Sequence, residues 1–180
     1  MVGQLLRAPG RLLHPLRRRA ARAVLRGRVP RTIVVVCHGN ICRSPLAAAL
    51  LRRALGPDGI RVESAGFIGP NRPPPRDAVS AAARRGVDLS DHRSRLLTAD
   101  LVNAADLLVV MEPEQQRTVC ERFGRWPSDV IVLGDLDPAP LEARTIRDPV
   151  TQPIEVYEQS YERIERCVQE FANVLGSAGG

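Results

Sequence analysis

The chain has 180 residues, 44% of them hydrophobic and 3% aromatic, which suits a single domain with a complete hydrophobic core. The formal net charge of +6 is unevenly distributed, because residues 1–31 contain nine arginines and no acidic residue, whereas the rest carries 17 basic and 20 acidic side chains, a net charge of −3. No apolar run reaches the length of a membrane span, and no secretory signal precedes the four cysteines, which argues against a transmembrane or disulfide-framed secreted protein and favours a reducing, cytoplasmic location.

Residues 1–31 are predicted to form a basic N-terminal extension that is flexible. Within it, residues 16–26 are compatible with a basic helix. Three interpretations stay open: a solvated arm, a start codon assigned too early, and a weak contact with anionic lipid or another acidic surface. Because aromatic residues are not interleaved with the arginines, we expect no specific binding of nucleic acid.

From residue 32 onward, strand and helix patterns alternate. Short apolar runs predict buried strands, and segments with helical spacing between proline and glycine signals predict helices. The expected strands are 32–37, 60–64, 106–111 and 129–133, and the expected helices are 46–55, 76–85, 98–104, 113–123 and 154–175. This alternation predicts a single α/β domain over residues 32–176, with a four-stranded parallel sheet, helices on both of its faces, and a flexible tail at 177–180.

The most informative segment follows the first predicted strand and reads Cys37-His38-Gly39-Asn40-Ile41-Cys42-Arg43-Ser44-Pro45. Parallel sheets bind ligands beyond the carboxyl ends of their strands, which is where Cys37 stands. A short loop before a helix turns backbone N–H groups inward, and the helix N-terminus adds positive potential, so that an oxyanion such as phosphate is bound. A nucleotide P-loop is excluded, because the segment contains no Gly-Lys-Ser/Thr. The segment therefore predicts a phosphate site that contains a thiol.

The side chains of this loop suit that chemistry. Arg43 offers a planar fork to two phosphate oxygens, and the same positive groups favour the thiolate of Cys37, which is then a nucleophile. Ser44 can donate a hydrogen bond to that sulfur. Gly39 and Asn40 both tolerate the left-handed backbone of a tight loop. The predicted phosphate-binding residues are His38, Gly39, Asn40, Ile41, Cys42 and Ser44.

This loop resembles the Cys-x5-Arg-Ser loop of the bacterial low-molecular-weight protein tyrosine phosphatases. The similarity extends over residues 32–175 and includes the segments 63–66 and 86–95 and the dipeptide Asp148-Pro149 before the last predicted helix. It implies a phosphatase that needs no metal and no cofactor. It also implies a phosphorylated protein as substrate, with a bacterial tyrosine kinase as one candidate partner.

The resemblance assigns a role to each catalytic position. Cys37 would attack phosphorus and form a phosphocysteine, and Arg43 would bind the phosphoryl oxygens. Asp148 would protonate the leaving phenolate and then activate the water that hydrolyses the intermediate. Asp137, which is also followed by a proline, is the second candidate for this acid.

Further residues receive weaker roles. His92 would hydrogen-bond Asn40 and support the loop. Cys42 is either a packed thiol or the partner of Cys37 in a reversible disulfide. We expect Cys120 and Cys167, the two cysteines in predicted helices, to be packed thiols. We also expect a solvated Asp135 and a structural role for Glu112.

The substrate pocket departs from the family pattern. Val150 and Thr151 follow Asp148-Pro149, where many members carry aromatic residues, and the nearest aromatic in the first recognition loop is Phe67, close to the prolines at 73–75. The mouth of the site is therefore expected to be shallower.

Three alternative functions stay open. In protein-arginine phosphatases of the same fold the position of Ile41 tends to hold threonine, so that Ile41 favours phosphotyrosine. A thiol-dependent arsenate reductase requires further cysteines near the loop, and Cys120 is separated from it by a predicted helix. A basic-arm binding protein with an inactive loop is the non-enzymatic alternative, and the intact loop residues argue against it.

Overall fold

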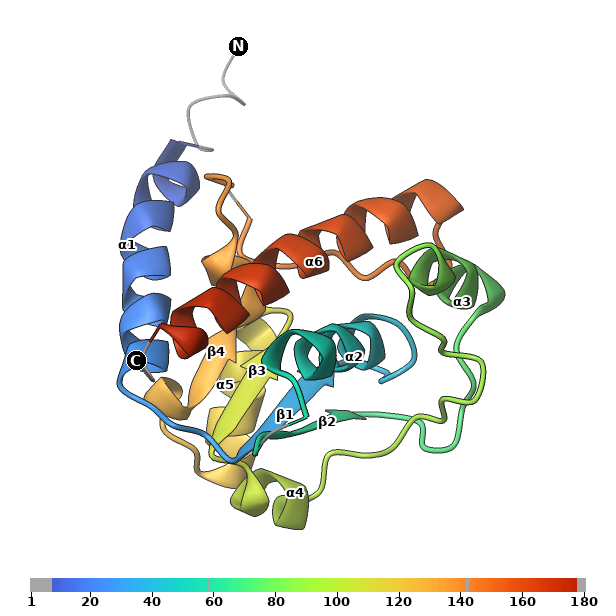
Figure 1. The fold of residues 1–180 in the computed structure, drawn as a ribbon, viewed down its shortest axis with the longest axis horizontal. Helices are drawn as coiled ribbons and strands as arrows, with labels where there is room; N and C mark the ends of the chain where they lie inside the picture. The colour runs from blue at the N-terminus through green and yellow to red at the C-terminus, as the bar shows by residue number, and fades with distance from the viewer. Residues whose placement is uncertain (1–7, 58, 142, 178–180) are drawn as a thin grey trace.

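The computed structural model describes residues 8–57, 59–141 and 143–177. Within them the chain forms one sheet of four parallel strands in the order β2-β1-β3-β4 (Figure 1). The strands are β1 (Thr32–Cys37), β2 (Arg61–Gly66), β3 (Leu107–Val110) and β4 (Val130–Val132). This confirms the predicted α/β fold with a four-stranded parallel sheet.

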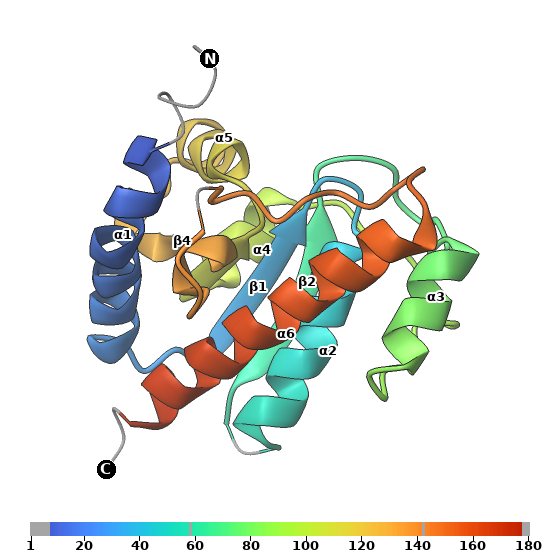
Figure 2. The same cartoon turned by 90° about the horizontal axis from the view of Figure 1, so that it is seen from above.

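Helices cover both faces of the sheet (Figures 1 and 2). One face packs against α2 and α6 around Ile33 and Val35 of β1, and the other packs against α4 and α5 around Val34 and Val36. Since β1 is buried on both faces, its continuous apolar sequence matches its place in the centre of the sheet. The helices are α1 (Ala8–Arg26), α2 (Arg43–Leu55), α3 (Arg76–Ala83), α4 (Ala99–Ala104), α5 (Pro113–Phe123) and α6 (Ile154–Gly176), with short 3-10 turns η1 (Pro127–Asp129) and η2 (Leu133–Leu136).

The register of the sheet brings the loop after β1 against the end of β2. Cys37 is paired with Gly66, the last residue of β2. A Cβ atom on Gly66 would lie 2.8 Å from the backbone nitrogen of Asn40, closer than real Cβ atoms approach. Glycine at this position therefore allows the loop to fold down onto β2.

Two of the predicted helix ends are confirmed, and the start of α2 and the end of α3 (Ala83) differ from the prediction. Thr98 caps α4 by accepting a hydrogen bond from the backbone N–H of Leu101 at 3.3 Å, and Gly124 ends α5 with a left-handed backbone. Helix α2 begins at Arg43, three residues earlier than the apolar pattern predicted. Pro45 tolerates this start, because the first turn of a helix leaves its N–H groups without a helical partner.

The basic extension predicted for residues 1–31 contains a helix in its described part. Residues 8–26 form helix α1, which lies beside the end of α6 and η2 (Figure 1). This helix is longer than the one considered for residues 16–26. Leu25 is fully buried and His14 is 4% exposed, so that the helix contacts the domain, while the flexibility of the extension stays a prediction.

The C-terminal residues are described as far as Ser177. Ser177, the first residue of the predicted tail at 177–180, donates its backbone N–H to Asn173, and the other three residues lie outside the described part. Among the helices of the described residues, none has the length and apolar character needed to cross a membrane.

Candidate active site

Cys37 ends β1 and is 2% exposed. The backbone N–H of Asn40 donates to its Sγ at 3.2 Å, and the Oγ of Ser44 lies 3.1 Å from it. The sulfur therefore has two hydrogen-bond partners within the loop. Cys42 caps α2 without any side-chain hydrogen bond, so that the first N–H groups of this helix add positive potential to the loop.

Asn40 fixes the shape of the loop. It is fully buried and adopts a left-handed backbone with φ 52°. Its amide nitrogen donates to the hydroxyls of Ser44 and Ser64, each at 2.9 Å, and its Oδ1 accepts the backbone N–H of Arg95 at 2.9 Å. Because Asn40 donates to the Oγ of Ser44, the hydroxyl hydrogen of Ser44 is available to Cys37 at 3.1 Å or to the carbonyl of Ala65 at 3.4 Å.

Arg43 lies across the floor of the site with its side chain 1% exposed. One terminal nitrogen donates to Glu112 at 2.6 Å and to the carbonyl of Ile146 at 2.9 Å, and the other donates to Asp148 at 2.6 Å. Burial by itself would lower the pKa of Arg43, but the negative charges of Cys37, Asp148 and Glu112 raise it above its ordinary value. Among the described residues, its buried Nε has no hydrogen-bond partner, which fits a donor aimed at an anion.

Asp148 reaches this cluster from the loop before α6. Its Oδ1 accepts the backbone N–H of Val150 at 3.3 Å, a short turn that holds the carboxylate in place. Its side chain is 37% exposed and lines the same pocket as Cys37. The structure therefore brings together all three residues for which the sequence predicted catalytic roles.

Asp137, the second candidate for the acid, has a structural environment. It is fully buried, and its carboxylate accepts hydrogen bonds from Arg163 at 3.0 Å and Arg166 at 3.1 Å. It does not line the pocket that contains Cys37. Asp135 is also buried, at 6% exposure, and pairs with Arg144, so the expectation of a solvated Asp135 was wrong.

The pocket in front of Cys37 has a volume of about 120 Å³. Its polar and aliphatic walls are Cys37, His38, Gly39, Ile41, Cys42, Ile68, Arg72, Asp148 and Val150. Phe67 is not among them, because it packs against the apolar cluster on the other face of the sheet. An aliphatic pair, Ile68 and Val150, thus stands where the family pattern suggested aromatic residues.

Arg72 and Tyr161 are site residues that sequence reasoning missed. Arg72 donates to the carbonyls of Gly69 at 2.9 Å and Gly39 at 3.1 Å, which ties the pocket wall to the phosphate loop. Tyr161, a fully buried residue of α6, donates its hydroxyl to the carbonyl of Cys42 at 3.3 Å. Neither belongs to a local motif, since each reaches the loop from a distant part of the sequence.

His92 supports the loop through its backbone. Its Nε2 lies 2.7 Å from the carbonyl oxygen of Asn40, so this nitrogen carries the hydrogen. Burial lowers the pKa of His92 and outweighs the hydrogen bond to Asn40, with Arg52, Arg93 and Arg95 adding repulsion. The predicted contact is present, although it reaches the main chain of Asn40 and leaves the amide to bind Ser44 and Ser64.

The other cysteines lie in settings unlike that of Cys37. Burial, followed by the charges of Cys37 and Asp148, raises the pKa of Cys42 far above its ordinary value. Burial also raises the pKa of Cys167 to about 12. Cys120 is half-buried in α5 and packs beside the apolar cluster of β3 and β4. Cys42 is therefore a neutral thiol next to a nucleophile.

A second hollow of about 190 Å³ lies between α1 and β4. Its charged lining residues satisfy one another, because Arg144 and Arg17 both face Asp135, at 2.7 Å and 3.7 Å. None of the described residues that line this hollow is a cysteine, serine or histidine.

Comparison with known proteins points to the same site. A family model described as low molecular weight phosphotyrosine protein phosphatase matches residues 32–178. The probable phosphatase EpsP of Ralstonia nicotianae is 39% identical over 151 residues, which cover 83% of this chain and 99% of that protein. A protein-arginine-phosphatase of Bacillus subtilis is 32% identical and covers 79% of this chain and 95% of its own length. The crystal structure of the tyrosine phosphatase Wzb from Escherichia coli K30 with sulphate superposes with a TM-score of 0.74 at 28% identity, over 82% of this chain and 100% of that one.

Proposed function

Since the chain belongs to the low molecular weight phosphotyrosine protein phosphatase family, we propose that it hydrolyses phosphotyrosine in proteins through a phosphocysteine at Cys37. The observation that carries this proposal is that Cys37 and Asp148 line one pocket, while the buried guanidinium of Arg43 bonds the carboxylate of Asp148. The chain also spans nearly the whole length of the curated relatives it matches.

In the first step the thiolate of Cys37 forms a bond to phosphorus while the bond from phosphorus to the phenolic oxygen breaks. The Nε of Arg43 and the N–H groups at the start of α2 donate to the phosphoryl oxygens, where negative charge is greatest. Asp148, in its protonated form, gives its hydrogen to the departing phenolic oxygen. The products of this step are the dephosphorylated tyrosine side chain of the substrate protein and a phosphocysteine.

In the second step a water molecule attacks phosphorus and loses its proton to the carboxylate of Asp148. The bond between sulfur and phosphorus breaks, and Cys37 leaves as a thiolate. Ser44 and the backbone N–H of Asn40 stabilise that leaving group, because both lie within hydrogen-bond reach of the sulfur. Inorganic phosphate is the final product, and no metal takes part in either step.

The walls of the pocket support an aromatic substrate over phosphoarginine. Ile41, Ile68 and Val150 present aliphatic surface to the pocket, which suits a phenyl ring better than a charged guanidinium, because several of its hydrogen-bond donors would lose water against these side chains. The relative from Bacillus subtilis keeps protein-arginine phosphatase as the second candidate. Asp148 would be the acceptor for a guanidinium in that case.

The experiment compares phosphotyrosine, phosphoarginine and phosphoserine peptides of one flanking sequence on one purified sample. We expect the highest kcat/KM on phosphotyrosine and no turnover by Cys37→Ser. If phosphoarginine is hydrolysed preferentially, the proposed mechanism would stand, but the proposed substrate would be phosphoarginine instead of phosphotyrosine. Full turnover by Cys37→Ser would contradict the mechanism itself, and Cys120→Ser provides the matched control for loss of a thiol outside the pocket.

The physiological partner is proposed to be a phosphorylated protein, with a tyrosine kinase as one candidate, in the cytoplasm. The relatives named as tyrosine phosphatases support a phosphoprotein substrate. Incubation of the Cys37→Ser variant with tyrosine-phosphorylated cell extract, followed by mass spectrometry of retained proteins, tests which protein it is.

A further inference from the structure

Helix α1 has an outer face that combines exposed leucines with arginines. Leu12, Leu16 and Leu13 are 75%, 63% and 49% exposed. Arg11, Arg19 and Arg26 are exposed on the same helix. We call this surface the outer face of α1; its residues are Arg11, Leu12, Leu13, Pro15, Leu16, Arg19, Ala20, Ala23 and Arg26. The helix lies N-terminal to the part of the chain that the family model matches.

The opposite side of α1, which we call its inner face, is in contact with the rest of the domain, so that the outer face points toward solvent. His14 bonds the carbonyl of Asp137 at 2.9 Å, and Leu25 is fully buried in the main core. Arg18 and Arg22 both pair with Glu170 of α6. Helix α1 is therefore packed against the domain through these residues. Its exposed leucines lie on the other side and do not contact the domain core.

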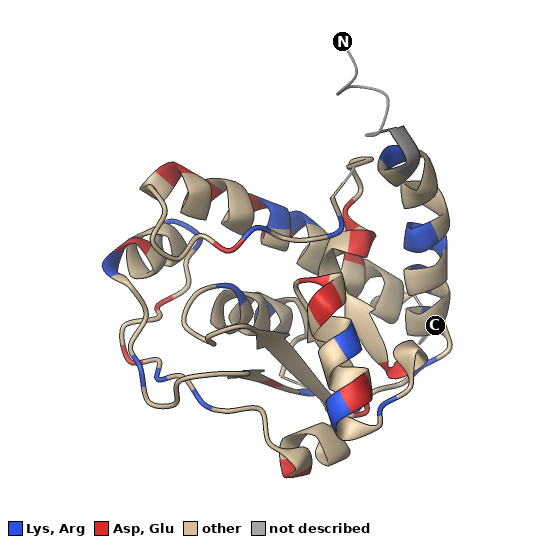
Figure 3. Ribbon diagram, turned by 180° about the vertical axis from the view of Figure 1, so that it is seen from behind, with Lys and Arg blue, Asp and Glu red and all other residues tan. Residues whose placement is uncertain are grey.

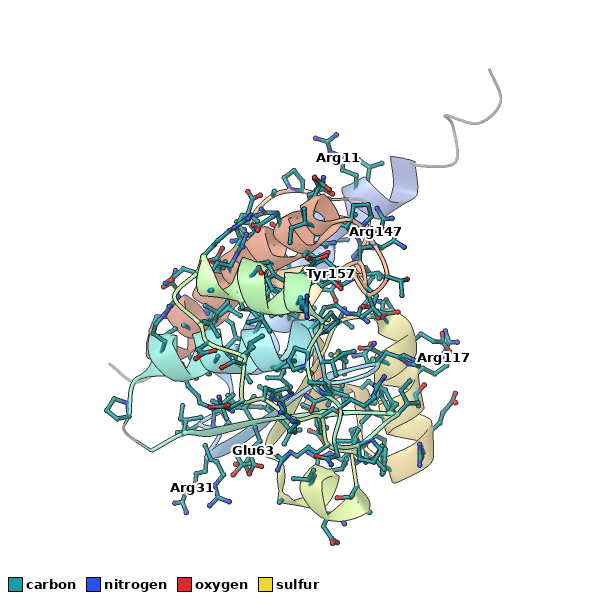
Figure 4. The ribbon with its side chains drawn as sticks, turned by 90° about the vertical axis from the view of Figure 1, so that its right-hand side faces the viewer. Arg11, Arg31, Glu63, Arg117, Arg147 and Tyr157 are labelled. Atoms are coloured by element: carbon teal, nitrogen blue, oxygen red, sulfur yellow. The ribbon has the colours of Figure 1, made fainter. Side chains whose placement is uncertain are left out.

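The charges of the outer face are of one sign. Residues 1–31 contain no acidic side chain, and Figure 3 shows basic positions along α1 without an acidic one. Figure 4 shows Arg11 projecting away from the body of the protein. In the described part of the chain, no ion pair involves Arg11, Arg19 or Arg26. A partner for this face must therefore be negatively charged and must also receive the leucines.

We propose that the outer face of α1 binds anionic phospholipid membranes. An amphipathic helix lies in the plane of the membrane interface with its apolar side chains among the acyl chains, while arginines contact the lipid phosphates. A nucleic acid would use the arginines but leave the leucines in water. A second copy of this face in a two-fold dimer would bring the arginines of both subunits together, which is unfavourable.

Binding in this way would leave the active site open. Helix α1 packs against α6 and η2 on the β4 side of the sheet. Figure 2 shows α1 and α3 on opposite sides of the molecule, and the pocket walls Ile68 and Arg72 belong to the segment that leads into α3. The membrane would concentrate the enzyme at the surface without covering the mouth of the pocket.

The test measures co-sedimentation of the full chain with two kinds of vesicle, one of phosphatidylcholine alone and one of equal parts phosphatidylcholine and phosphatidylserine. We expect binding only to the second kind, and weaker binding as salt increases. Leu12→Ser with Leu16→Ser, and separately Arg11→Gln with Arg19→Gln, should each weaken binding by about tenfold or more.

Matched controls change equally exposed groups elsewhere. Trp126→Ser removes a side chain that is 75% exposed outside α1, and Arg61→Gln with Arg117→Gln removes two arginines that are 73% and 62% exposed. Both controls should bind vesicles like the unchanged protein. Turnover of a soluble aryl phosphate should stay the same in every variant, which shows that each one is folded.

Several results would overturn the proposal. These are failure to bind the anionic vesicles, equal binding to neutral vesicles, and loss of binding in the control variants. Binding of duplex DNA that depends on the arginines and not on the leucines, without vesicle binding, would assign the face to a nucleic acid instead. A change in molecular mass in solution on replacing the leucines, again without vesicle binding, would assign it to a second copy of the chain.

Discussion

Asp148 accepts a hydrogen bond of 2.6 Å from Arg43, the side chain that is proposed to bind the phosphate. The proposed acid and the proposed phosphate ligand are therefore paired with each other. A phosphate dianion entering the pocket would compete with the carboxylate of Asp148 for the guanidinium of Arg43, because both anions are suited to the same donors.

The first prediction concerns this acid. Asp148→Asn should lower kcat by roughly 10²- to 10⁴-fold, the range of general acid catalysis, and the loss should be greatest for poor leaving groups. The measurement is kcat for a series of aryl phosphates with increasing phenol pKa. Asp100→Asn, an exposed residue of α4, is the control. A uniform loss across the series would show that Asp148 does not protonate the leaving group.

The second prediction concerns Glu112, which holds Arg43 from the opposite side at 2.6 Å. Glu112→Gln removes a charged hydrogen bond, which is worth about 1.5–3 kcal/mol, so kcat/KM and the affinity for inorganic phosphate should both fall by roughly tenfold to a hundredfold. Glu114→Gln on the same helix is the control, because that side chain is 68% exposed. Unchanged inhibition by phosphate in Glu112→Gln would contradict a positioning role.

The third prediction concerns the thiols. At neutral pH, iodoacetamide should alkylate Cys37 before Cys42, because burial raises the pKa of Cys42 and keeps it protonated, while the loop donors stabilise the thiolate of Cys37. Inorganic phosphate should protect Cys37 from the reagent. Mass spectrometry of the digested protein measures both effects, and earlier labelling of Cys42 would disprove the assignment of the nucleophile.

The fourth prediction concerns His92 and pH. Since burial lowers its pKa in the folded state, the unfolded chain binds a proton at higher pH than the folded chain does. The contribution of His92 to stability is therefore complete above about pH 6.5, the ordinary value, and is lost as the pH falls from there through the lowered folded value. Urea unfolding from pH 8 to 5 should show a shallower loss for His92→Gln than for the unchanged protein. Parallel profiles would contradict this assignment.

The fifth prediction tests the packing of α1. Leu25→Ala should lower the free energy of unfolding by about 2–5 kcal/mol, the usual cost of a leucine cavity, because Leu25 is fully buried. Leu12→Ala on the same helix should change it by less than about 0.5 kcal/mol, because Leu12 is 75% exposed. Equal effects from the two variants would indicate that α1 is not packed against the domain in solution.

Local patterns were sufficient for the strands and for the phosphate loop. The continuous apolar residues of β1 can be buried on both faces only if the strand lies in the middle of a sheet. Because Arg43 is only six residues after Cys37, both lie at the same end of this strand. The fold class and the proposed roles of Cys37 and Arg43 were therefore predictable. Helix α5 was predicted with its observed bounds, because a proline starts it and a glycine ends it.

Contacts between distant parts of the chain were not predictable. The sequence offered two aspartates before prolines, and only the tertiary structure separated them, since Asp137 is buried between arginines of α6 whereas Asp148 enters the pocket. The supporting roles of Arg72 and Tyr161 depend on segments 33 and 119 residues from their partners. Such pairings leave no periodicity in a sequence.

The sequence by itself determined the chemistry of this protein, because a thiol, an arginine and a run of backbone N–H groups are confined to one short loop whose geometry is local. Only the tertiary structure placed Asp148 rather than Asp137 beside that loop, shaped the pocket with Ile68 and Val150, and packed helix α1 against the domain. Packing explains the difference: Leu25 of helix α1 is buried in the main core and His14 bonds the carbonyl of Asp137, which leaves Leu12 and Leu16 exposed on the other side of the helix.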